Sequence, residues 1–251
     1  WFRSPVTVVH ALGIALAIFM VIAAFLGLML DGGGSPVQRS AQSKTSTGRR
    51  GAVLLLDALG HTASDWTQAP GAIPRDTALV WLPAVPRIVG VEEDSEEGEA
   101  LLGQLHSPLS YYEFMEQGGV LVLRGSADAE NFLVDQLGLY EFEDVFQDRV
   151  SGRTSRRVVL EATGEELELD WTAENPYEDY LDPIELHYVD EQGEPLAISL
   201  EVGAGRLIVL GDDSFLDNDR IADRDNALFL ARFVEEFAPG GPVLFDEYSL
   251  G

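Results

Sequence analysis

The sequence contains no cysteine. Disulfides, thiolate nucleophiles and cysteine-based metal sites are therefore excluded, because each of them requires a thiol. The absence leaves the cellular compartment open, since a chain without cysteine is compatible with either side of a membrane.

Lysine is nearly as scarce, and Lys44 is the single lysine of the chain. Sixteen basic residues face 43 acidic ones, which gives a formal net charge of −27. This balance argues against nucleic acid as a partner, because phosphates attract patches of lysine and arginine. It also disfavours a soluble part that lies flat on an anionic membrane surface. Ordinary solubilising charge and adaptation to a salty environment both explain such a surface.

Charge is also missing from one long stretch near the start of the sequence. No residue from Ser4 to Leu30 carries a permanent charge. A helix over residues 6–30 would span ~37 Å at about 1.5 Å per residue, enough for a hydrocarbon core of ~30 Å. The pattern predicts a single-pass transmembrane helix over residues 6–30, preceded by an interfacial segment over residues 1–5. Apolar residues spread along this predicted anchor include Val6, Leu12, Ala17, Phe25 and Leu30.

A cleaved signal peptide is the competing interpretation of this stretch. The apolar core of a signal peptide is about 7–15 residues long, and this run is longer, so we predict a retained anchor. Basic residues follow the run at Arg39, Lys44, Arg49 and Arg50. Taken alone, the positive-inside rule would place the following domain in the cytoplasm.

Residues 31–50 are rich in Gly, Ser, Thr and Gln and contain almost nothing apolar. Such a composition predicts a flexible linker. An acidic domain over residues 51–251 follows it.

Short apolar runs that end at Gly or Pro divide this domain into elements. The run Gly51–Leu59 predicts a helix with Ser46 or Thr47 as its cap and Gly60 as its stop. The alternation of helices and strands at both ends, around a β-hairpin-rich insert over roughly residues 150–200, predicts a three-layer α/β domain. Further helices are predicted at 98–105, 111–117, 128–137 and 225–237, and strands at 77–82, 120–123, 156–160, 166–171, 184–189, 196–202, 206–210 and 242–245.

An acidic cluster directly follows the predicted strand 206–210. Ligands of open α/β sheets bind beyond the carboxyl ends of the strands, and carboxylate oxygens could hold Ca²⁺ or Mg²⁺ there. The spacing is not that of an EF-hand loop. Helix capping and turn formation by Asp and Asn explain the same cluster without a ligand. The candidate metal ligands are Asp212, Asp213, Asp217 and Asp246.

The last predicted strand is followed by three polar residues, Asp246-Glu247-Tyr248. They could lie beside Asp212 at the same edge of the sheet, where paired carboxylates could do acid–base work. The candidate ligand-binding or interaction residues are therefore Asp212, Asn226, Asp246, Glu247 and Tyr248.

The segments GRLIVL (205–210), GDDSFL (211–216) and VLFDEY (243–248) resemble the bacterial DUF4350 family. LLLDALGH (54–61) resembles its opening helix, and the resemblance covers roughly residues 51–251. Membership would imply a flavodoxin-like fold, similar to glutamine-amidotransferase domains, carried by a membrane helix. It would also imply a periplasmic rather than cytoplasmic domain, among other membrane proteins. No biochemical activity is established for that family.

The sequence offers no complete catalytic constellation. A related amidotransferase needs a cysteine nucleophile, and Gly125-Ser126 is not a GxSxG elbow. We therefore predict no catalytic residue and no cofactor, with a divalent cation as the one open exception. The leading hypothesis is a non-catalytic, membrane-anchored interaction domain, an accessory or structural subunit whose partners are the lipid bilayer and other membrane proteins. The alternatives are an extracytoplasmic ligand- or cation-sensing domain and a metal-assisted hydrolase.

Overall fold

The computed structural model describes residues 40–83, 109–143, 145–146, 150–160, 164–173, 184–191, 193 and 195–247. The predicted anchor over residues 6–30, its interfacial segment over residues 1–5, the helix predicted at 98–105 and Tyr248 lie outside these residues. None of the helices in the described ranges is long and apolar enough to cross a bilayer.

One nine-stranded sheet organises the described residues, in the order β1-β9-β2-β3-β8-β7-β6-β4-β5. The first five strands of this order run parallel to one another, and the last four continue the same sheet in antiparallel pairs. The α/β class predicted from the sequence is confirmed, and the hairpin-rich segment extends the parallel sheet. The parallel strands are β1 (Ala63–Trp66), β9 (Val243–Asp246), β2 (Leu79–Trp81), β3 (Val120–Arg124) and β8 (Gly205–Leu210). The antiparallel strands are β7 (Pro195–Val202), β6 (Glu185–Asp190), β4 (Val150–Leu160) and β5 (Glu165–Ala173).

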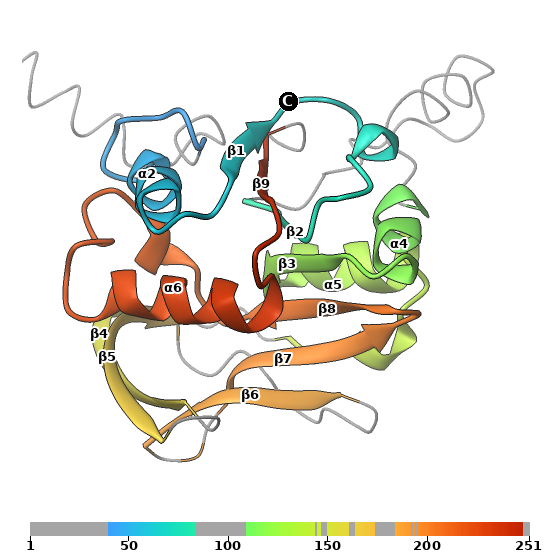
Figure 1. Cartoon of the computed structure of the whole chain (residues 1–251). Helices are drawn as coiled ribbons and strands as arrows, with labels where there is room; N and C mark the ends of the chain where they lie inside the picture. Colours follow the sequence, from blue (N-terminus) through green and yellow to red (C-terminus); the bar gives the residue numbers. More distant parts are fainter. Residues whose placement is uncertain are drawn as a thin grey trace, which may run out of the picture. The chain divides into compact units, whose positions relative to one another are not determined.

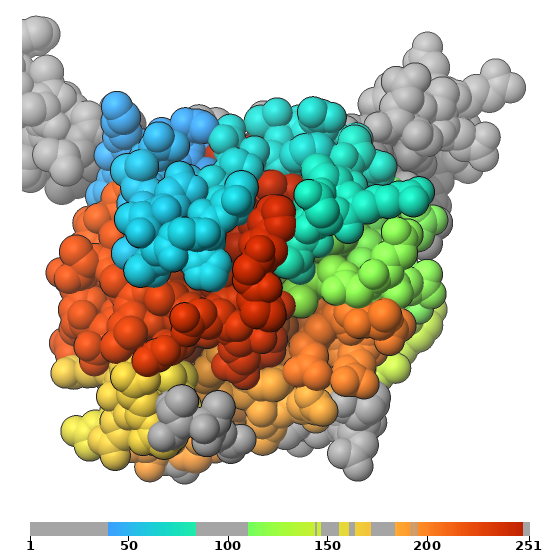
Figure 2. All heavy atoms as spheres, viewed as in Figure 1, coloured from blue at the N-terminus to red at the C-terminus, as the bar shows by residue number. Residues whose placement is uncertain are grey.

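Helices cover both faces of the sheet, and Figure 1 shows α6 in front of it and α5 behind. One face packs against α2 (Arg50–Ala58) and α6 (Asn226–Phe237). The other packs against α4 (Leu109–Glu116) and α5 (Ala127–Asn131). Figure 2 shows α2, in blue, against the orange-red residues of α6. Short helical turns are η2 (Pro70–Ala72), η3 (Phe132–Gln136, π-helical), η4 (Tyr140–Phe142) and η5 (Ser214–Leu216).

The central parallel strands are apolar because they are buried on both faces. All residues of β2 and β9 are buried, and so are the first four of β3. A parallel strand covered by helices on both sides has no solvent-facing row, so its sequence does not alternate between apolar and polar residues. This continuity made these strands visible in the sequence.

The start of α2 differs from the prediction that Ser46 or Thr47 caps it. The residue before the helix is Arg49, which makes no side-chain cap bond. Instead the Asn218 side chain, from a distant loop, accepts a hydrogen bond from the Gly51 amide at 2.6 Å. An amide in the first helical turn has no partner within the helix, so a residue far along the chain satisfies it. Gly60, with φ +92°, follows the helix end as predicted.

An aromatic cluster joins the antiparallel half of the sheet to α6. The ring of Tyr188, in β6, packs edge-on against Phe229 and Phe237 of α6. Its hydroxyl donates a hydrogen bond to Glu236 Oε2 at 2.6 Å. Burial, the hydrogen bond to Glu236 and the charge of Glu236 raise the pKa of Tyr188 far above its ordinary value. The hydroxyl therefore stays protonated as a donor.

Candidate functional site

The carboxyl ends of the five parallel strands meet at one edge of the sheet, which we call the carboxyl edge. Asp246 ends β9 and Asp212 follows β8, so both predicted residues lie there. However, β2 and β3 separate the two strands, which places them roughly 14 Å apart at about 4.8 Å per strand. The paired carboxylates proposed from the sequence are therefore not neighbours.

Asp246 is fully buried. Its Oδ2 accepts a hydrogen bond from the hydroxyl of Tyr111, a residue of α4 that is also fully buried. A hydroxyl bonded to a buried carboxylate is among the stronger hydrogen bonds in proteins. Asp246 therefore fixes α4 against the end of β9.

Asp213 forms an ion pair with Arg49, and both side chains are 1% exposed. The bond joins Arg49 Nη2 to Asp213 Oδ2. A buried ion pair is strongly destabilised when one partner is removed, because the other charge is left without compensation. This pair ties the residue before α2 to the loop after β8.

Two other candidates bond to groups inside the fold. Asp212 accepts hydrogen bonds from the Ser214 amide at 3.1 Å and from the Ser214 hydroxyl at 2.7 Å. Asn226 accepts from the Asp170 amide at 3.1 Å and donates to the Arg220 carbonyl at 2.8 Å. Asp212 makes the local bond that the turn explanation of the cluster expects. Asn226 instead joins the start of α6 to β5, 56 residues away in the sequence.

The composition of residues 40–49, which we call the edge strap, predicts a flexible linker, but the structure packs these residues on the carboxyl edge. The Ser40 hydroxyl donates to Glu247 Oε1 at 2.7 Å, and the Ala41 amide donates to the same carboxylate. Ala41 itself is only 2% exposed. Glu247, predicted as an interaction residue, thus holds the start of the strap.

Asn218 holds the rest of the edge strap. Its side-chain nitrogen donates to the Ser43 carbonyl at 2.9 Å and to the Thr45 carbonyl at 2.7 Å. Together with the bond to Gly51, this side chain satisfies three backbone groups. The folded domain therefore begins earlier than residue 51, because side chains from the end of the chain supply bonds that the composition of 40–49 does not show.

The carboxylates of this edge do not converge on a common point. Across the part of the chain that the structure describes, no group of three or more His, Asp and Glu residues could hold a metal ion. The set includes the candidate ligands Asp212, Asp213, Asp217 and Asp246, which the structure describes in full.

Buried nitrogen donors also lie near the carboxyl edge, on both faces of the sheet. Trp66, Trp81 and Arg124 are the last residues of β1, β2 and β3. Within the described ranges, the buried side-chain nitrogens without a hydrogen-bond partner are Nε and Nη1 of Arg49, Nε1 of Trp66 and Trp81, and Nε of Arg124. All of these atoms are hydrogen-bond donors. Trp66 and Trp81 pack on opposite faces of the sheet, so no single ligand contacts both.

Sequence reasoning did not identify Arg49, Tyr111 or Arg124 as residues of this edge. Arg124 could have been predicted from the sequence, because a cation that directly follows the apolar run 120–123 would lie at the carboxyl end of a strand. Arg49 and Tyr111 could not, since their partners are 164 and 135 residues away.

No protein-family model matches the sequence, and no curated protein matches it. The fold is similar to part of an exo-β-1,4-mannosidase, Op5Man5, from Opitutaceae bacterium strain TAV5, with a TM-score of 0.33 and 17% identity over 51% of this chain and 22% of that one. It is also similar to part of Gan42B, a GH42 β-galactosidase from G. stearothermophilus, with a TM-score of 0.31 and 14% identity over 64% of this chain and 30% of that one. The chain thus spans less than a third of the length of these enzymes, and likenesses of this size do not identify a function.

Proposed function

We propose that this chain is a non-catalytic, membrane-anchored interaction domain, an accessory subunit of a larger membrane complex. The bonding of the carboxyl edge supports the proposal most. The carboxylates of Asp212, Asp213, Asp246 and Glu247 each hold an internal hydrogen bond or ion pair. Carboxylates that hold the fold together are not held ready for acid–base chemistry, which requires a group poised against a substrate.

The proposed setting follows from the sequence. Residues 6–30 would anchor the chain in the bilayer, and the resemblance to the DUF4350 family favours a flavodoxin-like domain on the periplasmic side. The five parallel strands with helices on both faces are compatible with that fold. The proposed partners are the lipid bilayer and other integral membrane proteins.

Membrane anchoring is tested by alkaline carbonate extraction of vesicles that carry the full chain. We expect the wild type to stay in the membrane pellet. The double substitution Ile18→Arg and Phe25→Arg should release the chain, because each arginine near the centre of a membrane helix costs about 2.5–3.5 kcal/mol. The matched control, Ile18→Leu with Phe25→Leu, should stay in the pellet. Extraction of the intact wild-type chain would refute the anchor.

The subunit role is tested by purification of the full chain in mild detergent. We expect the same membrane proteins to co-purify in fixed ratio across independent preparations, as measured by quantitative mass spectrometry. A monomer recovered without companions would contradict the subunit role while leaving the anchor intact.

A ligand-sensing domain is the second candidate, and Arg124 favours it, because this cation ends β3 at the carboxyl edge and its Nε has no partner among the described residues. Donors select oxygen-rich or anionic ligands over cations. Phosphate or acetate should therefore raise the melting temperature of the full chain by mass action, and Arg124→Met should abolish the effect. A shift produced by Ca²⁺ or Mg²⁺ and reversed by EDTA would instead indicate a cation site. The described residues give the hydrolase alternative no support.

A further inference from the structure

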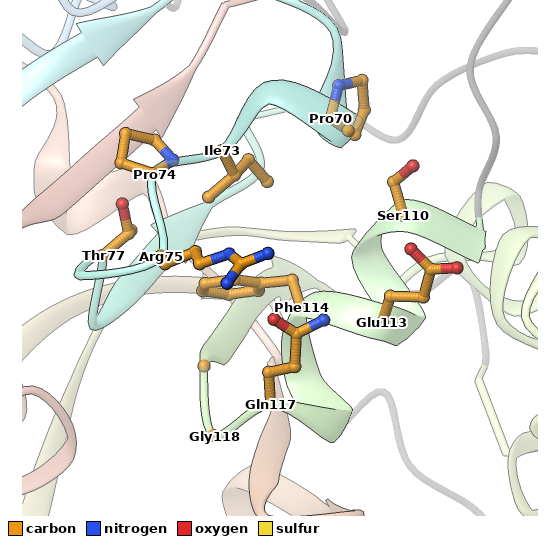
Figure 3. Close-up of a pocket in the computed structure, with 12 residues that line it drawn as sticks. Pro70, Ile73, Pro74, Arg75, Thr77, Ser110, Glu113, Phe114, Gln117 and Gly118 are labelled. Carbon is orange, nitrogen blue, oxygen red and sulfur yellow. The ribbon is translucent and has the colours of Figure 1, made fainter.

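A second polar site lies where β2 and β3 begin, at the opposite end of the parallel strands from the carboxyl edge. It is a pocket of about 300 Å³, and we call it the amino-edge pocket. One wall is the loop over residues 70–77 that leads into β2, and the other is α4 with the Gly118-Gly119 turn that leads into β3 (Figure 3). No residue of this pocket was a candidate from the sequence.

The α4 wall is a single stripe of the helix. Ser110, Glu113, Phe114 and Gln117 follow one another at helical spacing, so they share one face. All four line the pocket, and Figure 3 shows them on the side of the helix that faces the loop. The opposite wall contributes Arg75, whose side chain extends toward α4.

The aromatic part of the pocket is fixed in place by glycine. A Cβ atom at Gly119 would come within 2.2 Å of the Phe114 ring, so the ring occupies space that only glycine leaves free. The Gly119 amide also donates to the Phe114 carbonyl at 3.0 Å. The ring is therefore held before any ligand arrives, which lowers the entropic cost of binding.

The polar groups around the pocket are unbonded. Among the described residues, the side chains of Arg75, Thr77, Ser110, Glu113 and Gln117 make no hydrogen bond and no ion pair. Thr77 is the sharpest case, because it is 6% exposed and its buried hydroxyl has no partner. A buried hydroxyl without a partner destabilises the fold.

The two charges of the pocket have opposite sign and do not pair with each other. Arg75 stands on the loop wall and Glu113 on the helix wall. A ligand with only a negative charge would leave the charge of Glu113 uncompensated. A ligand with only a positive charge would leave the charge of Arg75 uncompensated. A ligand that carries both charges satisfies both walls.

We infer that the amino-edge pocket binds a small zwitterion of the free α-amino acid class. Arg75 binds the carboxylate and Glu113 binds the ammonium group. The hydroxyl of Ser110 and the amide of Gln117 bind the remaining polar atoms. Phe114, with Pro70 and Ile73, covers the side chain of the ligand. The volume lies at the lower end of the range of ligand pockets, about 300–1,000 Å³, which suits a molecule of this size.

The test is calorimetric titration of the full chain in mild detergent with the common L-amino acids. We expect at least one to bind. Its amide, which lacks the carboxylate charge, and its N-acetyl derivative, which lacks the ammonium charge, should each bind about tenfold or more weakly, because hydrogen bonds to charged groups contribute about 1.5–3 kcal/mol.

Variants locate the binding. Arg75→Ala and Glu113→Gln should each weaken the best ligand about tenfold or more. Arg75→Ala should leave the affinity for the amide nearly unchanged, because the amide has no carboxylate charge for Arg75 to bind. Glu113→Gln should likewise leave the affinity for the N-acetyl derivative nearly unchanged, because that derivative has no ammonium charge for Glu113 to bind. Glu116→Gln on the same helix and Arg157→Ala on β4 lie outside the pocket and serve as controls that retain full affinity.

Three results would overturn the inference. The first is that none of the amino acids produces a heat of binding when it is titrated into the folded chain. The second is affinity that survives Arg75→Ala combined with Glu113→Gln. The third is binding of a neutral polyol such as glycerol or glucose in place of an amino acid. None of them bears on the membrane anchor or the subunit role, so the two proposals fail separately.

Discussion

The polar side chains at the two ends of the parallel strands differ in burial and in bonding. At the carboxyl edge, Asp213 and Asp246 are buried and bonded to side chains from other elements. At the amino-edge pocket, Arg75 and Glu113 are exposed to a hollow and bonded to nothing among the described residues. The carboxylates that the sequence marks as functional thus hold the fold together, while the polar groups left unbonded lie where the sequence shows no motif.

This difference has an energetic basis. A buried polar group is destabilising unless it is bonded, so a folded domain uses its buried carboxylates for structure. A polar group that borders a cavity can remain hydrated and keep its bonding capacity for a ligand. The contrast predicts that substitutions at the two edges will change the free energy of unfolding by different amounts and in opposite directions.

The largest effect is expected for the ion pair of the carboxyl edge. Asp213→Ala should lower the free energy of unfolding by about 3–5 kcal/mol, because it leaves the Arg49 guanidinium buried without its partner. The double substitution Arg49→Met with Asp213→Leu should recover much of that loss. Urea unfolding of the full chain, followed by tryptophan fluorescence, measures both. A double variant as unstable as the single one would show that the pair has no special coupling.

A smaller loss is expected for the bond between α4 and β9. Tyr111→Phe should lower the free energy of unfolding by about 1.5–3 kcal/mol, because it removes the donor to the buried Asp246 carboxylate. The neighbouring Tyr112→Phe should have almost no effect in the same urea titration, since the Tyr112 hydroxyl has no partner among the described residues. Equal effects of the two substitutions would contradict the structural role assigned to Asp246.

At the amino-edge pocket, a substitution is expected to increase the free energy of unfolding instead of lowering it. Thr77→Val removes a buried hydroxyl without a partner and keeps the shape of the side chain, so it should raise the free energy of unfolding by about 1 kcal/mol. Thr77→Ser, which keeps the hydroxyl and loses the methyl group, should not. Thermal unfolding in the absence of amino acids measures the difference. A loss of stability in Thr77→Val would mean that the hydroxyl already has a structural bond.

The smallest effect is expected for the charge on the helix wall of the pocket. Glu113→Gln should change the free energy of unfolding by less than about 0.5 kcal/mol, because the side chain is exposed and unbonded. Glu116→Gln should behave the same way, so stability alone will not separate the two residues. The two substitutions should differ in amino acid affinity, because only Glu113 lines the pocket.

The sequence predicted the fold best where burial is continuous. The strands at 120–123 and 206–210 were found because their apolar runs end at recognisable turns. Strand β1, Ala63–Trp66, was missed because it is four residues long and includes Ser64 and Asp65. It lies at the end of the sheet and pairs only with β9, so its sequence carries little of the apolar signal of a central strand.

The candidate site was predictable in position but not in bonding. The rule that ligands meet the carboxyl ends of parallel strands located Asp212 and Asp246 at one edge. Their spacing depends on strand order, which no local pattern shows. The amino-edge pocket was harder, because the loop over residues 70–77 has no periodicity that would indicate which wall it faces. Only the helical stripe that starts at Ser110 could have been read in advance.

The bond between Ser40 and Glu247 also joins two residues that are 207 positions apart in the sequence. Both residues lie at the carboxyl edge. Any segment joined before residue 40 and any segment joined after residue 247 thus share one point of attachment. A reporter or a surface fused at either position would hold the domain by the same end, and the mouth of the amino-edge pocket would lie at the far end of the strands from it.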